Sequence, residues 1–185
     1  MVSGNARTFI LRGARRVVSQ EGDAGHAEFL QSAARLLDVG DRLTVRPGYY
    51  DFDEERSEFF DITLCLNVLH HLGGSFGDPA MSLDDARRQM LSGLNRLART
   101  THTLFLQIGY QWKGRAGQPL FARGSKSEQI DFVSQGTAGI WRIDDIVVAS
   151  GFSGSFEPIN GRNAGRDDSL GEFLNRPLFH MTSLV

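Results

Sequence analysis

The sequence predicts an α/β fold with a mainly parallel sheet and helices on both of its faces. Short apolar segments rich in β-branched residues alternate along the chain with longer segments whose apolar residues recur at helical spacing. Strands joined through helices pair in parallel through right-handed crossovers. The 21 glycines are spread over the 185 residues and do not gather in a linker. We therefore expect one domain over residues 1–185.

The composition is ordinary for a folded protein and excludes several classes. With 20 basic and 22 acidic residues the formal net charge is −2, which gives no indication of a nucleic-acid or anionic membrane partner. The single cysteine, Cys65, excludes an internal disulfide and a zinc site built from several thiolates. No apolar run approaches the ~20 residues of a membrane span. We expect a cytoplasmic protein. The sequence does not indicate an oligomeric state.

The first third of the chain predicts three strands and one helix. Residues 14–20 are apolar and β-branched at their centre, which predicts a strand. Apolar residues at helical spacing predict a helix over residues 26–39 that ends at Gly40. Residues 42–46 alternate and predict a second strand, and the more apolar residues 60–66 predict a third. The first 20 residues are also arginine-rich and acid-free, as transit peptides are, but the predicted strand favours an ordered domain.

A second helix is predicted from its N-terminal signal. Ser82 is the expected N-cap, and Asp85 stands in for the usual glutamate of a capping box. The apolar stripe that follows predicts a buried face made of Leu83, Ala86, Met90, Leu91, Leu94 and Leu97.

The last third predicts strands, one helix and two irregular stretches. A strand is expected over residues 103–108, and a helix over residues 141–150 with Gly151 as its C-cap. Strands are also expected over residues 154–159 and 177–182, with the polar residues 160–171 between them.

Residues 109–139 are long, Gly- and polar-rich and weakly patterned, which predicts a lid or substrate loop. In that role Tyr110, Trp112, Lys113 and Phe121 would close over a substrate. A loop without such a role is the alternative.

Ligands of parallel α/β sheets bind beyond the carboxyl ends of the strands, so residues that follow a strand are the candidates for function. Glu21 directly follows the strand predicted over residues 14–20. A carboxylate there can accept both hydroxyls of a ribose, because its two oxygens match two neighbouring O–H donors. The alternative is an acid that interacts with the dipole of the next helix.

A more specific motif follows the strand over residues 60–66. The strand contains Asp61 near its start, and the chain then reads Val-Leu-His-His-Leu over residues 68–72. This stretch resembles the fourth motif of class I S-adenosylmethionine (SAM)-dependent methyltransferases, an Asp-led apolar strand followed by a helix start of the VLHHL or VLEHL type. The resemblance implies a Rossmann-like methyltransferase sheet with a C-terminal antiparallel hairpin, and SAM as the cofactor. Residues 141–152 resemble the late helix of the family and the start of its hairpin.

The resemblance also assigns cofactor-binding residues. Glu21 matches the acid that holds the SAM ribose. Gly48 and Tyr49 match the turn after the third strand, where many members have Gly-Asp in contact with the adenine amino group. Tyr49 departs from that pattern and would stack on adenine instead. Leu66 matches the end of the fourth strand of the family, and Asn67 matches the position just past it, which would face both cofactor and acceptor.

The glycine-rich loop of the family is incomplete in this sequence. Ser3, Gly4 and Asn5 resemble the tail of that loop, with Ala6 in place of its third glycine. The first strand, with its acidic residue, is missing, and its neighbours would then lose a partner in the sheet. We expect either a chain that starts inside a longer protein or a domain that has rearranged and lost SAM binding, and we favour the first.

The predicted catalytic residues are Asn67 and His70. A histidine at the sheet end, His70 or His71, can act as general base on a hydroxyl or amine. The alternative is a histidine that only packs or caps the helix. Cys65, inside a strand, is expected to be inert core. The remaining histidines are too scattered to predict a metal site: His26, His102 and His180.

These observations favour a SAM-dependent methyltransferase that acts on a small or medium-sized acceptor molecule. The main alternative is a methyltransferase-like binding or partner module without catalysis, suggested by the missing first strand. A nicotinamide-dependent dehydrogenase would share the ribose carboxylate, but the sequence has no GxGxxG motif.

Overall fold

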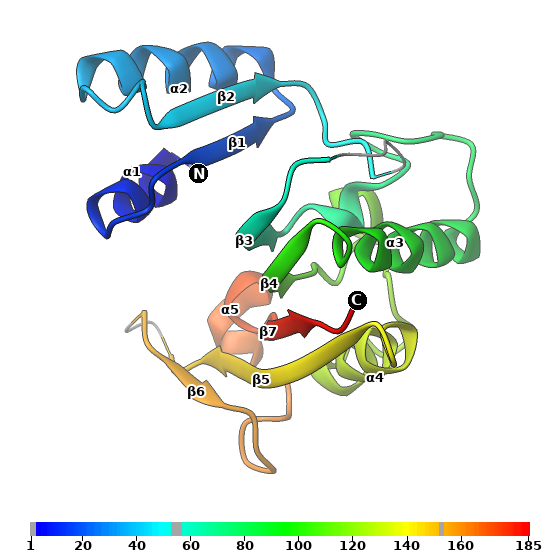
Figure 1. Ribbon diagram of the computed structural model, residues 1–185. Coiled ribbons are helices and arrows are strands. Elements are labelled where there is room, and N and C mark those ends of the chain that lie inside the picture. The colour runs from blue at the N-terminus through cyan, green and yellow to red at the C-terminus, as the bar shows by residue number, and fades with distance from the viewer. Residues whose placement is uncertain (1–2, 53–56, 152–153) are drawn as a thin grey trace. The chain divides into compact units, whose positions relative to one another are not determined.

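The computed structural model describes residues 3–52, 57–151 and 154–185 (Figure 1). The chain divides into two compact units, unit 1 (Met1–Asp51) and unit 2 (Phe52–Val185), each described here by itself. The two units are groups of residues that contact one another more than they contact the rest of the chain. This division does not test the single domain expected over residues 1–185, which stays a prediction. Strands and helices alternate in both units, which confirms the α/β class.

Unit 1 is a small parallel α/β unit. Its elements are α1 (Ser3–Leu11), β1 (Val17–Glu21), α2 (Ala24–Leu36) and β2 (Leu43–Pro47). The two strands pair in parallel from Val17 opposite Leu43 to Glu21 opposite Pro47, so both strands end at the same edge. In its described part, a buried apolar cluster is formed by Ala6, Ile10, Ala34, Val39 and Leu43.

Unit 2 contains a five-stranded sheet in the order β3-β4-β7-β5-β6. The strands are β3 (Phe60–Leu66), β4 (Thr101–Gln107), β5 (Trp141–Ala149), β6 (Phe156–Pro158) and β7 (Leu178–Ser183). Strands β3, β4 and β5 run in one direction, because β7 is antiparallel to both β4 and β5. Strand β6 is antiparallel to β5. The predicted parallel part of the sheet and its antiparallel C-terminal part are therefore both present.

Helices α3 (Leu83–Leu97) and α4 (Lys126–Gly136) pack against each other and hold the sheet of unit 2. The indole N–H of Trp141 donates to the carbonyl of Leu94, which joins β5 to α3. A Cβ atom on Gly136 of α4 would lie 2.3 Å from the side chain of Leu91 on α3, so the two helices are in close contact at this glycine. The core includes six fully buried side chains, Leu94, Leu104, Leu106, Val133, Phe179 and Met181.

The N-terminal cap of α3 was predicted correctly. The hydroxyl of Ser82 accepts a hydrogen bond of 3.1 Å from the backbone N–H of Asp85. Most of the predicted stripe is buried, namely Ala86, Met90, Leu94 and Leu97. Strands β6 and β7 also form where strands were expected, with boundaries that differ by one to two residues.

The helix predicted over residues 141–150 is wrong, because this segment is strand β5. Ile143, Ile146, Val147 and Val148 are β-branched and favour a strand. The strand is paired on both sides, with β7 and β6, and this pairing overrides the helix-like spacing of its apolar residues. The resemblance of residues 141–152 to a late helix is wrong for the same reason.

The loop predicted over residues 109–139 is also wrong, because the segment contains helix α4 and the short 3-10 helix η2 (Trp112–Gly114). Tyr110 and Phe121, expected to close over a substrate, are buried core residues. A capping box starts α4: the Ser125 hydroxyl accepts from the Glu128 N–H, and the Glu128 carboxylate accepts from the Ser125 N–H. The capping-box residues can be recognised in the sequence, but the apolar residues that follow them do not recur clearly enough at helical spacing to predict a helix.

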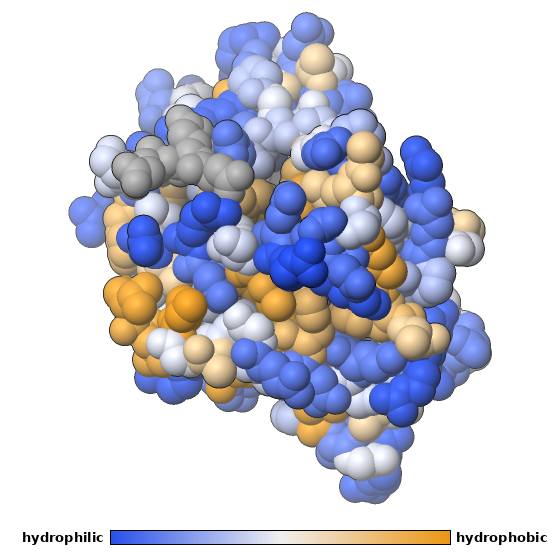
Figure 2. Space-filling view, turned by 90° about the vertical axis from the view of Figure 1, so that its right-hand side faces the viewer, coloured by the Kyte–Doolittle hydropathy of each residue, from blue (hydrophilic) through white to orange (hydrophobic). Residues whose placement is uncertain are grey.

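The surface is mixed in polarity. Figure 2 shows hydrophobic side chains gathered at several places among hydrophilic ones on one face. Exposed large apolar residues include Phe29 and Leu36 in unit 1 and Phe59, Ile62 and Phe173 in unit 2. Among the described residues, no helix has both the length and the apolar character needed to cross a membrane.

Candidate functional site

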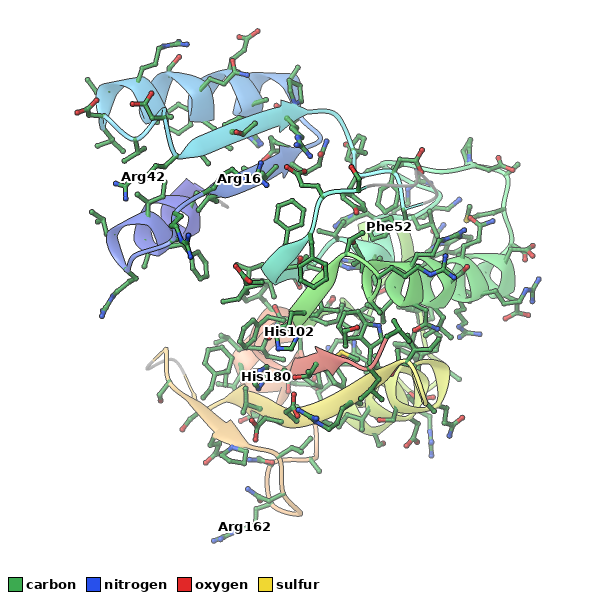
Figure 3. All side chains as sticks on the ribbon, in the orientation of Figure 1. Arg16, Arg42, Phe52, His102, Arg162 and His180 are labelled. Carbon is green, nitrogen blue, oxygen red and sulfur yellow. The ribbon has the colours of Figure 1, made fainter. Side chains whose placement is uncertain are left out.

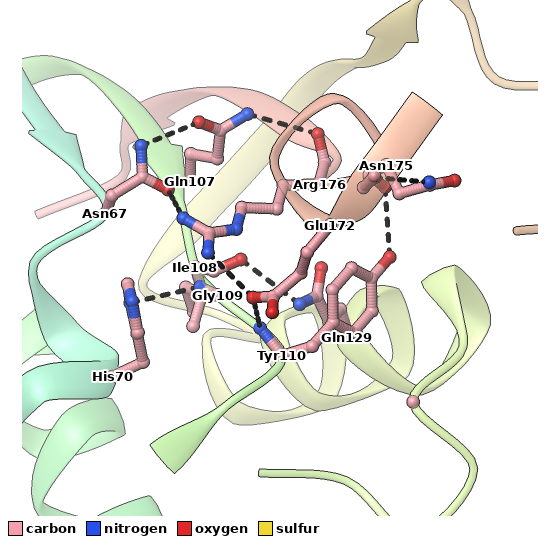
Figure 4. A network of polar contacts seen from close by, with 12 residues as sticks. Asn67, His70, Gln107, Ile108, Gly109, Tyr110, Gln129, Glu172, Asn175 and Arg176 are labelled. Carbon is pink, nitrogen blue, oxygen red and sulfur yellow. Dashed lines mark hydrogen bonds and ion pairs between the residues drawn. The ribbon is translucent and has the colours of Figure 1, made fainter. Parts of the chain in front are cut away.

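Polar residues of unit 2 gather at the carboxyl ends of β3 and β4 (Figure 4). Asn67 directly follows β3, and Gly109 and Tyr110 follow β4. The 3-10 helix η1 (Leu69–His71), which carries both histidines, comes next after Asn67. The chain then returns to this edge through η3 (Asp168–Leu170) and α5 (Gly171–Leu174), just before β7.

Asn67 is held in an unusual backbone conformation. Its φ is +61°, in the left-handed region that costs a non-glycine residue roughly 1–2 kcal/mol. The backbone N–H of Asn67 donates to the carbonyl of Gln107 over 2.8 Å. Its side-chain amide donates to Gln107 Oε1 over 3.0 Å. The end of β3 is thus fastened to the end of β4 by main chain and side chain together.

Arg176 closes a ring of hydrogen bonds with these two amides. Its Nη1 donates to Asn67 Oδ1 over 2.6 Å. Gln107 Nε2 in turn donates to the backbone carbonyl of Arg176 over 3.1 Å. We call Asn67, Gln107 and Arg176 the amide ring. It joins three segments that are up to 109 residues apart in the sequence.

Glu172 extends the amide ring to the segment after β4. Its Oε1 accepts from Arg176 Nη2 over 2.7 Å and from the backbone N–H of Tyr110 over 3.1 Å. The Tyr110 hydroxyl donates to the carbonyl of the fully buried Asn175 over 3.0 Å. Burial raises the pKa of Tyr110, so its hydroxyl stays protonated. Both ends of α5 are therefore bound to the end of β4.

His70 is buried, with 2% of its surface exposed. Its Nδ1 accepts a hydrogen bond of 3.1 Å from the Gly109 N–H, and this bond assigns the ring proton to Nε2. Burial lowers the pKa of His70 to about 3, with further contributions from the charges of His71 and Arg176. At neutral pH His70 is therefore uncharged and offers a donor at Nε2.

The His70 ring explains the glycine at position 109. A Cβ atom on Gly109 would stand 2.6 Å from His70 Cδ2 and Nε2. His71 packs beside His70, with 4.2 Å between ring centroids, and is less deeply buried. Burial and then the charge of Arg176 lower its pKa, and a hydrogen bond with the Lys113 backbone opposes them. His71 is thus also kept neutral.

The described part of unit 1 brings three predicted cofactor residues together. Glu21 is the last residue of β1, and its carbonyl accepts a 2.8 Å hydrogen bond from the Gly48 N–H. Gly48 has a φ of +100°, which explains glycine at this turn. Gly22 lies against the Tyr49 ring, because a Cβ atom there would stand 2.2 Å from Tyr49 Cε1. Tyr49 is half exposed beside the end of β1.

The other predicted cofactor residues lie as follows. Ser3, Gly4 and Asn5, expected in a loop, form the first turn of α1. Ala6 is buried in the core of unit 1, and Leu66 is the last residue of β3. Met1 and Val2, at the start of the expected loop, lie outside the described residues.

Cys65, His102 and His180 do not belong to the two groups of residues described above. Cys65 is buried in β3, and burial raises its pKa to about 12, as expected for an inert thiol. His102 and His180 lie on β4 and β7 (Figure 3), and His180 stacks on Phe105 with 5.0 Å between ring centroids. The described residues contain no group of three or more His, Cys, Asp or Glu placed to hold a metal ion.

The sequence reasoning missed Gln107, Glu172 and Arg176. Gln107 could have been predicted from the sequence, because it is a polar residue at the end of an apolar strand, and the same signal identified Asn67. Glu172 and Arg176 belong to a polar stretch with no recognisable pattern. Only the pairing of β7 beside β4 brings them to this edge of the sheet.

No protein-family model and no curated protein sequence matches the chain. Solved structures do match. The structure of LaPhzM has a TM-score of 0.50 and 12% identity, over 98% of this chain and 47% of that one. The structure of the mitomycin 7-O-methyltransferase MmcR gives 0.48 and 17%, over 91% and 42%. A structure entitled PigF with SAH gives 0.46 and 11%, over 98% and 65%.

The chain spans less than two thirds of the length of each of these three proteins. At 12% identity the match to LaPhzM shows the fold alone. That fold is of the α/β class, as the sequence predicts.

Proposed function

We propose that the chain is a class I SAM-dependent methyltransferase domain that methylates a small or medium-sized acceptor molecule in the cytoplasm. One observation carries the proposal: Glu21, Gly48 and Tyr49 meet at the carboxyl ends of two adjacent parallel strands. The family resemblance expects the ribose carboxylate and the adenine contact at this place. The Val-Leu-His-His-Leu motif after β3 and the fold support the same assignment.

The residues of unit 1 fit the nucleoside part of SAM. One carboxylate oxygen of Glu21 accepts from the Asp23 N–H over 3.1 Å. A carboxylate has about four lone-pair sites, so Glu21 retains the capacity to accept two ribose hydroxyls. The half-exposed ring of Tyr49 offers a flat apolar surface to adenine.

We assign the methionine part of SAM to Ser3, Gly4 and Asn5. The backbone N–H groups in the first turn of a helix have no partner within the helix and can bind a carboxylate. We also propose that the first strand of the family's sheet is absent. In support, among the described residues β1 pairs with β2 alone and β3 pairs with β4 alone.

We place the acceptor at the edge of unit 2 where Asn67 and His70 lie. SAM supplies an electrophilic methyl group, which the acceptor's nucleophilic atom attacks in line. Because that methyl is already activated, orientation of the acceptor is the main contribution required of the protein. Asn67 has one amide N–H left for this task, and His70 offers Nε2–H. For His70 to act as a base, its Nδ1 must exchange the Gly109 N–H for the acceptor.

Isothermal titration with SAM and S-adenosylhomocysteine (SAH) tests the proposal. We expect saturable binding of both compounds to the wild-type chain. Glu21→Ala should weaken binding about tenfold, the loss typical of removing a hydrogen-bonded charged group. Glu28→Ala, which removes an exposed acid of α2, is the matched control and should not change the affinity.

The rival function is a methyltransferase-like binding module without SAM. The helical conformation of Ser3, Gly4 and Asn5, in place of a glycine-rich loop, favours it. Well-folded wild-type protein that gives no heat with either compound would exclude the enzyme and support the module. Equal affinities of wild type and Glu21→Ala would show that the nucleoside site is misassigned.

A further inference from the structure

Several features that cost stability gather around the amide ring. Asn67 has a left-handed backbone conformation. The Nε atom of Arg176 is buried and has no hydrogen-bond partner in the described part of the chain, and the same holds for Gln129 Oε1. Each buried unpaired group costs about 1–3 kcal/mol. Such costs are retained where a defined local geometry is needed, which is characteristic of functional sites.

The side chains of the Arg176–Glu172 pair are more buried than those of the Arg88–Asp85 pair on α3. In the first pair they are 13% and 27% exposed, whereas in the second they are 71% and 46% exposed. Solvent screens a pair buried to this degree less than it screens a surface pair. The guanidinium also binds two different acceptors, Asn67 Oδ1 and Glu172 Oε1, in a fixed fork. A lysine in its place can bind these two acceptors only as a flexible point charge.

The two acceptors connect Arg176 to the two segments that follow β3 and β4. Asn67 directly follows β3 and leads into the histidine segment, while Glu172, on α5, accepts from the N–H of Tyr110 just after β4. Removal of the guanidinium therefore takes one hydrogen bond from Asn67 and one from Glu172, which loosens both segments at once.

We infer that Arg176 is a positioning residue, which, together with Glu172, fixes the segments after β3 and β4 in the one arrangement that the proposed methyl transfer needs. This inference rests on the proposed function. It assigns a role outside the Val-Leu-His-His-Leu motif, to residues that the sequence pattern does not single out. Arg176 acts through Asn67 and Tyr110, and we assign it no contact with the reacting atoms.

The test compares Arg176→Gln and Arg176→Lys with the control Arg88→Gln in the full chain. Backbone amide hydrogen exchange, read by NMR, reports on the Asn67 and Tyr110 N–H groups, and titration reports on SAH affinity. In Arg176→Gln we expect about tenfold faster exchange at both amides. We also expect about tenfold weaker SAH binding, because the family resemblance implies that Asn67 faces the cofactor as well as the acceptor. Arg176→Lys keeps the charge and should recover part of both. Arg88→Gln should change neither.

The outcomes separate the inference from the proposed function. Unchanged exchange at Asn67 and Tyr110 in Arg176→Gln overturns the inference. Faster exchange with unchanged SAH affinity also overturns it, because the ring is then only structural. If the wild-type chain itself binds no SAH, the proposed function fails. The inference then fails with it, whereas failure of the inference alone requires a wild-type chain that binds SAH. If Arg176→Gln does not fold, Arg176→Lys decides by the same two measurements.

Discussion

Asn67 was identifiable from the sequence because it is a polar residue directly after an apolar strand. The structure adds what the sequence lacks, namely the left-handed backbone and the three hydrogen bonds that hold it. Glu21 is a candidate for the same reason, whereas Gly48 and Tyr49 are candidates only through the family resemblance. Arg176 and Glu172 were not predictable, because their partners are distant in sequence and a lone arginine carries no signal of what it will contact.

The contact between Gly109 and His70 gives a prediction about stability. Gly109→Ala should lower the free energy of unfolding by about 1–3 kcal/mol, because the added methyl overlaps a buried ring that has little room to move. Gly165→Ala is the control, since a Cβ atom there meets no atom within 4 Å. Urea denaturation of both variants measures the difference. Equal effects would contradict the observed packing of His70.

Burial of the neutral His70 gives a prediction about pH. Its pKa falls from 6.5 to about 3 on folding, so between these values the unfolded chain binds a proton that the folded chain excludes. The contribution of the neutral His70 to the free energy of unfolding is therefore complete above pH 6.5, and it is lost as the pH falls toward 3. A single such group contributes at most about 1.4 kcal/mol per pH unit, or about 2 kcal/mol between pH 7 and pH 5.

Denaturation of wild type and His70→Gln at pH 7 and pH 5 isolates this contribution. His71 remains in both proteins, so its own titration is common to the two to a first approximation. Wild type should lose more stability than the variant over this range. Parallel losses would show that His70 is not held neutral by the fold.

At the scale of single elements, local signals decided which predictions succeeded. Ser82 marks the start of α3, where cap and apolar stripe agree. Helix α4 has an equally good cap at Ser125 but a weak stripe, and the helix was missed. Strand β5 has helix-like apolar spacing, but its β-branched residues and its two neighbouring strands determine its conformation. Pattern alone cannot decide such a segment, because the neighbours come from elsewhere in the chain.

The capping box of α4 predicts the effect of one substitution. Ser125→Ala removes the acceptor for the Glu128 N–H and should cost about 1 kcal/mol of unfolding free energy. Ser134→Ala, in the last turn of the same helix, should change stability by less than about 0.5 kcal/mol. Thermal or urea denaturation compares the two. Similar losses for both would contradict a helix that starts at Ser125.

At the scale of the whole molecule, the fold class was predictable and the strand order was not. Alternation of strands and helices is enough to identify α/β architecture. The position of β7 between β4 and β5 depends on contacts between Thr103–Leu106 and Phe179–Thr182, about 75 residues along the chain. That pairing brings Glu172 and Arg176 to Asn67. Because the pairing of β7 with β4 could not be predicted from the sequence, these two residues of the site could not be predicted either.

In the proposed function, this chain binds SAM at the carboxyl ends of its strands. NMR titration of the isotopically labelled chain with SAH tests it most directly, because each backbone amide reports separately. We predict saturable shifts that include the amides of Gly22, Gly48 and Tyr49. An absence of shifts up to about 1 mM SAH, where even a millimolar affinity is visible, would contradict the claim. Shifts confined to residues away from the strand ends would contradict it equally.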